Sequence, residues 1–446
     1  LQRNYGTLQY NKYPPYFLAY RVNKAEEHHI AANFGHIYDN SSSITVFLTI
    51  ELRVGGRETD NYHYLDQQSY SVKQVALPLD ENPALVRKIL QCETERDYRE
   101  SVLKYTENLV NATLYGSDSA EAFLFLPMDM DQYYEPPVSD DHWNADDWVN
   151  WLRHCTSDAS LSPNVTNASA EVTYKINRNY LVNSESSFTV QNHTEARLNL
   201  HIEALTDDNT TEHLDYPFFA PLPELLPNAM QDYFHLMEVL INDICNAPSQ
   251  ENLDCPVWLT DQAVVTLVHN LVGHSLENPA DGLFTGKLQR KVMPEGFSVI
   301  SDPTKKNLHN NYLMYDKYLN GGYTFDDEGV KSQRMVLVNH GVLEGFLSGR
   351  TQQSQAYMPN GSARGKNGLP AARQSNLIVG VDNHLTKGQF GINLSDELRR
   401  QNLPYGIRIV KADVVCDTNR DIITLCPTLC YKHFSDGREQ LVRDIR

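Results

Sequence analysis

The order of two hydrophobic periods along the chain is the strongest constraint on its fold. Residues 44–54 alternate apolar and polar side chains for much of their length and end at Gly55-Gly56, which is typical of a strand with one buried face. From Asn82-Pro83 to about residue 110, apolar residues recur at helical spacing. Strands followed by a helix and then by more strands favour an α+β fold over a doubly wound parallel sheet.

The length predicts two domains, because 446 residues exceed what one ordinary core holds. A second long helix is expected at residues 223–246, after which glycines become frequent and short strands dominate. We therefore place a boundary near residue 250. Residues 1–250 are expected to form an α+β domain with a mixed antiparallel sheet and long helices, and residues 251–446 a β-rich domain.

Smaller segments of the first 250 residues carry their own signatures. Strands are expected at residues 16–22, 171–181 and 197–205. Residues 157–170 are rich in Ser, Asn and Pro, which is typical of a surface loop. The acidic segment 139–152 contains three tryptophans and predicts a loop that leads into a short helix, with the indole rings in a core or an interface.

Charge and composition argue against a nucleic-acid partner and against a membrane-spanning helix. The formal net charge of −19 disfavours nucleic acid, because phosphate binding needs a basic face. No run of 18 apolar residues occurs, so no helix is expected to span a membrane. The chain begins at Leu1 without a visible signal peptide, as a processed, exported protein or a trimmed one would.

Glycosylation motifs and cysteines bear on the compartment. Eight Asn-x-Ser/Thr motifs, more than chance gives, suggest a secreted or periplasmic glycoprotein, with the cytoplasm as the alternative; they lie at Asn40, Asn111, Asn164, Asn167, Asn192, Asn209, Asn360 and Asn393. In an oxidising compartment the pairs Cys245/Cys255 and Cys426/Cys430 could form disulfides. No Cys-x-x-Cys motif occurs, which argues against a structural zinc ribbon.

One pair of histidines has a metal-site character. His269 and His274 follow an apolar stretch that can be helical, and imidazole is a good zinc ligand. Five residues correspond to about 140° of rotation on a regular helix, so both rings reach one ion only if the helix is locally unwound or contains a π-bulge. Gly273 would tolerate that distortion. Unrelated packing or surface roles are the alternative.

Several blocks in the same order resemble the TldD/PmbA family of zinc metallopeptidases, also called modulators of DNA gyrase, and its longer branch in particular. The segment His269-Asn-Leu-Val-Gly-His274 is similar to the family's HExxxH motif. The other blocks are 16–22 with Phe34-Gly35, 180–185, 323–329, 332–338, 339–347, 360–364 and 372–377.

The resemblance implies a role for each matching position. His269 and His274 would be zinc ligands, and zinc the cofactor. The general base of the family is a glutamate, but here the position is Asn270, and an amide cannot take a proton from water. Loss of a general base typically costs about 10²–10⁴-fold in rate.

The third ligand of the family is a cysteine near the C-terminus, which we cannot identify here. Cys416, Cys426 and Cys430 are candidates, with a disulfide or a buried thiol as the alternative for each. Glu277 is a further candidate, with a salt bridge as its alternative.

Other residues could contact a ligand. Arg373 and Asn376, in the block 372–377, are candidate substrate-binding residues, and Arg373 could equally pair with a carboxylate of the fold. The acidic turn 326–329 could bind calcium or be an ordinary turn. The loop 360–368 could cover a groove or form a hairpin tip.

Three functions follow. The first is a pseudoenzyme, a peptide-binding or structural subunit that forms a homo- or hetero-dimer with a family member. The second is an active zinc peptidase that degrades unfolded peptides. The third is a calcium- or glycan-dependent binding module. The sequence leaves enzymatic activity open, and Asn270 favours the first function.

Overall fold

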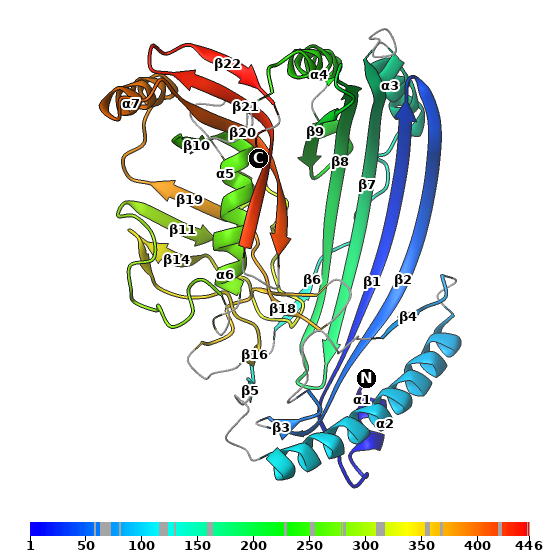
Figure 1. Ribbon diagram of the computed structural model, residues 1–446. Coiled ribbons are helices and arrows are strands. Elements are labelled where there is room, and N and C mark those ends of the chain that lie inside the picture. The colour runs from blue at the N-terminus through cyan, green and yellow to red at the C-terminus, as the bar shows by residue number, and fades with distance from the viewer. Residues whose placement is uncertain are drawn as a thin grey trace.

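The architecture is that of a long curved sheet facing a second, β-rich half of the chain (Figure 1). The computed structural model describes residues 1–57, 59–62, 73–79, 82–115, 124–128, 131–157, 164–226, 230–249, 255–277, 279, 282–308, 317–352, 357–365, 369–417, 422–443 and 445.

The long sheet has eight strands in the order β3-β2-β1-β7-β8-β6, with β4 beside β2 and β9 beside β8. All its pairs are antiparallel except β6 with β8. Its strands are β1 (Pro15–Asn33), β2 (His36–Gly56), β3 (Thr59–Asp60), β4 (Gln74–Ala76), β6 (Gln132–Tyr134), β7 (Val165–Asn183), β8 (Phe188–Leu205) and β9 (Thr211–Ala220). The expected strands are therefore present, but they are parts of much longer ones.

The loop expected at residues 157–170 is wrong in its second half. Residues 158–163 lie outside the described residues, and β7 begins at Val165. Ala168 and Ala170 point into the core, where they are fully or almost fully buried. Their small side chains alternate with Asn and Ser, and this hid a strand period that packing against helix α3 requires.

Helices cover the two ends of the outer face of this sheet (Figure 1). Helices α1 (Gln2–Leu8) and α2 (Pro83–Tyr115) lie at one end, and α3 (Ala145–Ser157) and α4 (Met230–Cys245) at the other. The helix expected from Asn82-Pro83 is confirmed as α2. The three tryptophans of residues 139–152 pack against the core between α3, α4 and the sheet, as the sequence predicts.

The second long helix begins later than expected. Residues 223–225 form a single 3₁₀ turn, and Leu226 is extended, with φ −66° and ψ 138°. Leu226 precedes a proline, whose ring disfavours the helical conformation in the residue before it. The α-helix therefore cannot run continuously from Pro223, and the described part of α4 starts at Met230.

The C-terminal half contains two four-stranded sheets. One has the order β10-β20-β21-β22, and the other has the order β15-β14-β11-β19. Their strands are β10 (Val257–Leu259), β20 (Tyr405–Asp417), β21 (Ile422–Phe434), β22 (Glu439–Val442), β11 (Phe297–Ser301), β14 (Met335–Asn339), β15 (Val342–Leu343) and β19 (Leu377–Val381). Short pairs join β12 (Asn307–Leu308) to β13 (Lys317–Tyr318), β5 (Leu124–Phe125) to β16 (Thr351–Gln352), and β17 (Ala363–Arg364) to β18 (Ala371–Ala372).

The C-terminal half also contains helices in its described part. Helix α5 (Asp261–Leu267) continues through a π-helical turn (Val268–Gly273) into α6 (His274–Glu277). Helix α7 (Lys387–Arg400), which the sequence reading did not anticipate, packs against β21. The α+β class is thus confirmed. We propose a boundary near residue 250: every strand of the long sheet ends before residue 221, and among the described N-terminal strands β5 alone pairs with the C-terminal half.

Two further expectations concern the membrane and the cysteines. Among the described helices, none combines the length and the apolar character needed to cross a membrane. Cys245, Cys426 and Cys430 are thiols, so neither expected disulfide is formed. Cys430 is buried and donates from Sγ to the Val442 carbonyl, which commits it to the core.

Candidate functional site

The π-helical turn brings the two histidines of the metal-like motif together. The backbone N–H of His274 donates to the carbonyl of His269, five residues earlier. The ring centroids of His269 and His274 are 4.9 Å apart, with 65° between the ring planes. On a regular helix the two side chains would diverge by about 140°. The extra residue in the turn therefore makes them neighbours.

Gly273 fits this turn because another segment approaches it closely. A Cβ atom at Gly273 would lie 2.1 Å from Oε1 of Gln374, which no real contact permits. The side chain of Gln374 also donates from Nε2 to the His269 carbonyl at 3.4 Å. Gln374 thus packs on the π-helical turn, and a residue larger than glycine at position 273 would require the flexible end of its side chain to shift.

Glu277 orients one of the two imidazoles. Its side chain is only 6% exposed and accepts from Nδ1 of His274 at 3.1 Å, from Arg373 at 3.0 Å and from the backbone N–H of Gln374 at 2.9 Å. An ionised carboxylate only accepts hydrogen bonds, so Nδ1 of His274 donates to it, and in the neutral imidazole the Nε2 lone pair stays available. This arrangement is common behind metal-bound histidines.

The donors around the pair do not fit a complete zinc site. A zinc site uses three or four protein ligands. Within the described ranges, no third His, Cys, Asp or Glu donor lies with both His269 and His274; the one group of three such donors is elsewhere. Glu277 is occupied by Arg373 and His274, as its salt-bridge alternative predicts. The side chain of Cys416 lies outside the described residues.

Asn270 is turned toward the backbone of its own helix. Its Nδ2 donates to the carbonyl of Thr266 at 2.9 Å. A side-chain amide has no basic lone pair that could take a proton from water near neutral pH. The geometry at this position therefore supplies a hydrogen-bond donor where the family motif has a carboxylate.

The two candidate substrate-binding residues have different surroundings. Arg373 is exposed and pairs with Glu277, so its carboxylate-pairing alternative is realised. Asn376 is buried: its Nδ2 donates to the carbonyls of Asp302 and Lys305, and its Oδ1 accepts from the backbone N–H of Gly321. Substrate contact by either residue stays a prediction, and the bonds of Asn376 favour a structural role.

The acidic turn is an internal brace rather than a calcium site. Asp326 is buried and accepts from the backbone N–H groups of Glu328, Val330 and Ala363, and Glu328 accepts from that of Arg350. Burial raises the pKa of both carboxyl groups. Calcium takes about six to eight oxygen ligands, and both carboxylate oxygens of Asp326 already accept from backbone N–H groups.

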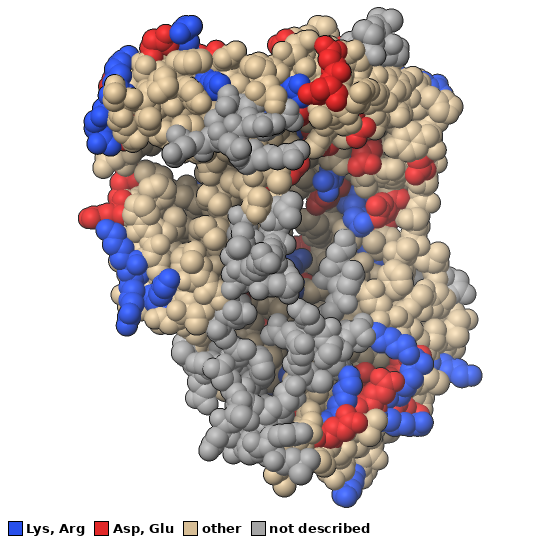
Figure 2. Space-filling view, in the orientation of Figure 1, with Lys and Arg blue, Asp and Glu red and all other residues tan. Residues whose placement is uncertain are grey.

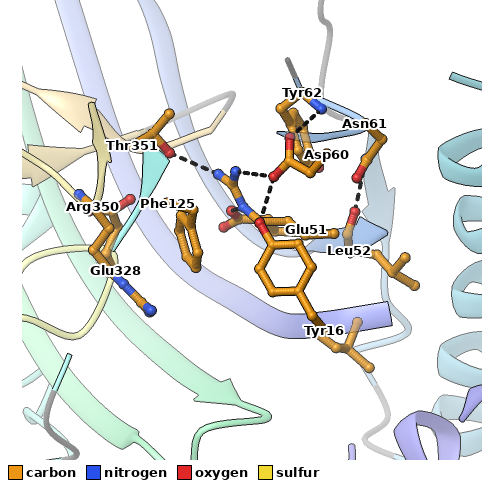
Figure 3. Close-up of polar contacts among 12 residues, drawn as sticks. Tyr16, Glu51, Leu52, Asp60, Asn61, Tyr62, Phe125, Glu328, Arg350 and Thr351 are labelled. Atoms are coloured by element: carbon orange, nitrogen blue, oxygen red, sulfur yellow. Dashed lines mark hydrogen bonds and ion pairs between the residues drawn. The ribbon is translucent and has the colours of Figure 1, made fainter. Parts of the chain in front are cut away.

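A buried network of charges, which the sequence reading missed, ties the two halves together (Figure 3). The guanidinium of Arg53 donates to Glu51 at 2.7 Å, to Asp60 at 2.9 Å and to Thr351 of the C-terminal half at 2.8 Å. Burial opposes the charge on Glu51, but Arg53 and Arg21 outweigh it and lower its pKa to about 2. The signal was the charged pair Glu51 and Arg53 at alternate positions on one face of the segment 44–54.

A polar groove lies between the inner face of the long sheet and the acidic turn. Its volume is about 710 Å³. The wall on the sheet includes Asn23, Lys175, Asn177, Asn179, Gln191 and Glu195, and the opposite wall includes Asp327 and Arg364. Figure 2 shows acidic and basic side chains in the hollow between the two halves. Arg21 lines this groove and donates from Nε to the Asp327 carbonyl at 2.6 Å, which fixes one wall against the other.

Comparison with known proteins agrees with this fold and motif. The model of the PmbA/TldA metallopeptidase C-terminal domain matches residues 252–398. A metalloprotease of Archaeoglobus fulgidus is 29% identical over 163 residues, which are 35% of this chain and 35% of that protein. A zinc metalloprotease TldD homologue of Saccharolobus solfataricus is 24% identical over 309 residues, which are 65% of this chain and 63% of that protein. The chain thus matches only part of the length of these relatives.

Solved structures extend the likeness of fold over nearly the whole chain. TldE from Thermococcus kodakarensis has a TM-score of 0.62 at 13% identity, covering 96% of this chain and 87% of that one. A Thermotoga maritima protein described as a modulator of a DNA gyrase has a TM-score of 0.66 at 13% identity, covering 99% of this chain and 89% of that one. Fold and motif together define a metallopeptidase-like protein. The chain belongs to the TldD/PmbA family, as its sequence blocks predict.

Proposed function

We propose that this chain is a non-catalytic TldD/PmbA-like subunit that binds extended polypeptide rather than cleaving it. The observation that carries the proposal is Asn270, whose amide bonds to its own helix at the position of the family's general base. Among the described residues, no third His, Cys, Asp or Glu donor joins His269 and His274, which points in the same direction.

The groove supplies the binding surface in this proposal. Its amide side chains offer both donors and acceptors, which match the N–H and C=O groups of an extended chain. Asn23 already donates to the side-chain carbonyl of Asn179 at 2.7 Å, so these amides are held in fixed orientations. Recognition through backbone groups would be largely independent of sequence.

Partners and compartment belong to the same proposal. A homo- or hetero-dimer with a family member is part of this proposal. Secretion and glycosylation remain predictions. Asn40 is exposed, but Asn360 is only 6% exposed and its amide is bonded to Ser348 and Phe346, so a glycan at Asn360 conflicts with the fold.

Binding is tested with a fluorescently labelled unfolded polypeptide and a groove-filling variant. Thr173 lines the groove, and Thr173→Trp should reduce affinity at least about tenfold by occupying the volume. Thr194→Trp is the matched control, because Thr194 lies on the neighbouring strand β8 and does not line the groove. Equal affinity of both variants and the wild type, or no binding by the wild type, would contradict the proposal.

The alternative, an active zinc peptidase, is favoured by the adjacent histidines and by the bond from His274 to Glu277. The same polypeptide separates the two functions when its cleavage is followed with zinc present. We expect no cleavage by the wild type. Turnover by the wild type that rises in Asn270→Glu would establish the peptidase instead.

A further inference from the structure

A second group of metal-binding side chains lies on the outer face of the long sheet, away from the histidine pair and the groove. Glu26 and His28 are alternate residues of β1, and Asp140 lies in the segment that leads into α3. One nitrogen or oxygen of each lies within 4.8 Å of those of the other two. No other such group occurs in the part of the chain that the structure describes.

Two of the distances are close to those expected for ligand atoms around one ion. Nε2 of His28 is 3.0 Å from Oδ1 of Asp140 and 3.8 Å from Oε1 of Glu26. Nitrogen and oxygen ligands at about 2.0–2.2 Å from zinc are separated by about 3–3.5 Å. Nδ1 of His28 bonds to Oγ of Ser42 at 2.8 Å, an outer contact that can hold the ring with Nε2 toward the two carboxylates.

The floor of this group contains a polar atom without a partner. Tyr174 lies directly opposite His28 on β7, and the two rings are stacked with 6.4 Å between centroids. Its side chain is fully buried, and its hydroxyl has no hydrogen-bond partner among the described residues. Burial raises the pKa of Tyr174 most, and the charges of Asp140, Glu224 and Glu26 raise it further. Its hydroxyl therefore lies in the field of these carboxylates. A buried hydroxyl without a partner is costly unless a ligand or its bound water completes it.

We propose that Glu26, His28 and Asp140 bind a divalent transition-metal ion of the zinc type, with the Tyr174 hydroxyl facing the ion or its bound water. One imidazole with two carboxylates suits zinc, whereas calcium prefers oxygen ligands alone. The ion fastens the segment before α3 to the middle of β1. Trp143, stacked on His28 at 5.2 Å, covers the site on one side.

A hydrogen bond between His28 and Asp140 can hold the same side chains together without a metal ion, and the experiment separates the metal site from the hydrogen-bonded pair. In that reading His28 donates from Nε2 to Asp140, and the contact is an ordinary histidine–carboxylate pair. A ligand that binds only the folded state raises its melting temperature, whereas a protonated pair gives no response to zinc.

Zinc titration of the full chain tests the site. The background carries His269→Gln and His274→Gln, so that the other imidazole pair does not contribute. Asp140→Asn is compared with Asp39→Asn, because the two carboxylates are equally exposed, at 45% and 44%, and each bonds to a histidine of β1. Calorimetry gives the affinity and the stoichiometry of zinc binding. Thermal unfolding with zinc, with calcium and with chelator gives the change in melting temperature.

We expect about one zinc per chain, a melting temperature that rises with zinc but not with calcium, and a loss of affinity of at least about tenfold in Asp140→Asn. Asp39→Asn should bind zinc like the background. The proposal is overturned if the background binds no zinc, or if Asp140→Asn and Asp39→Asn respond to zinc alike. A lower melting temperature of Asp140→Asn without any change in zinc response would identify the protonated pair.

Discussion

At the scale of single residues, Asp97 on helix α2 is a carboxyl group whose burial disfavours its charged form. Its Oδ2 is buried and has no hydrogen-bond partner within the described residues. Burial raises its pKa to about 7, and the charge of Glu100 acts in the same direction. An unfolded aspartate titrates near pH ~3.9, so the folded state binds more protons between these values. The contribution of Asp97 to stability is therefore full below about pH 4 and is lost as the pH rises through 7.

Asp97→Asn should stabilise the protein more at high pH than at low pH. The amide stays neutral, so the gain in free energy of unfolding should increase by about 2–3 kcal/mol between pH 5 and pH 8. Urea denaturation at both pH values measures it. Glu95→Gln, an exposed position on the same helix, should show no such trend. An equal gain for Asp97→Asn at pH 5 and pH 8 would mean that Asp97 is not held neutral.

At the scale of elements, helix α7 depends on its first turn. Oγ1 of Thr386 accepts from the backbone N–H of Gln389 at 3.3 Å, and the Gln389 side chain accepts from the backbone N–H of Thr386 at 3.0 Å. This reciprocal capping satisfies two N–H groups that the helix itself leaves unpaired. Ser395 then links the helix to His433 of β21 at 3.0 Å.

Removing the cap should cost a modest amount of stability. Thr386→Ala should lower the free energy of unfolding by about 1 kcal/mol, whereas Thr386→Ser, which keeps the hydroxyl, should change it by a few tenths. Both are measured by urea denaturation at constant pH. If alanine and serine behave alike, the cap does not stabilise α7.

At the scale of the whole molecule, Arg350 joins the two halves. The side chain is 1% exposed and donates from Nη2 to Glu185 at 2.7 Å and from Nε to the Leu126 carbonyl at 2.9 Å. Its guanidinium also lies 4.2 Å from the ring centroid of Phe125. Each of these partners belongs to the N-terminal half, so a residue of the C-terminal half is enclosed by the other one.

Arg350→Met should destabilise the protein strongly and loosen its cooperativity. It removes one of the two arginine partners of Glu185, which keeps Arg57 at 2.8 Å, and the bond to the Leu126 carbonyl, a loss of about 2–3 kcal/mol. Arg399→Met, which breaks an exposed pair with Asp396, should stay within about 0.5 kcal/mol of the wild type. Urea unfolding, followed by fluorescence and by circular dichroism, measures both. A variant Arg350→Met as stable as Arg399→Met would mean that the halves do not depend on this contact.

Local signals predicted much of the fold. The proline after Asn82 and the apolar period behind it gave α2, and the alternation in residues 44–54 gave part of β2. Local signals did not predict elements whose residues are compatible with more than one secondary structure. Ala168 and Ala170 belong to a strand only because α3 covers them, and the capping residues Thr386 and Gln389 marked a helix that short neighbouring strands obscured. Strand lengths depend on pairing across the sheet, which no single segment encodes.

The sequence by itself determined the chemistry at the family motif: two imidazoles five residues apart and an amide where a base would stand. The tertiary structure alone decided that the rings meet, because a π-helical turn forms where Gln374 packs against Gly273. It also brought His28 to Asp140 from 112 residues away. The type of a side chain is a local property, whereas its direction and neighbours follow from packing between segments distant in sequence.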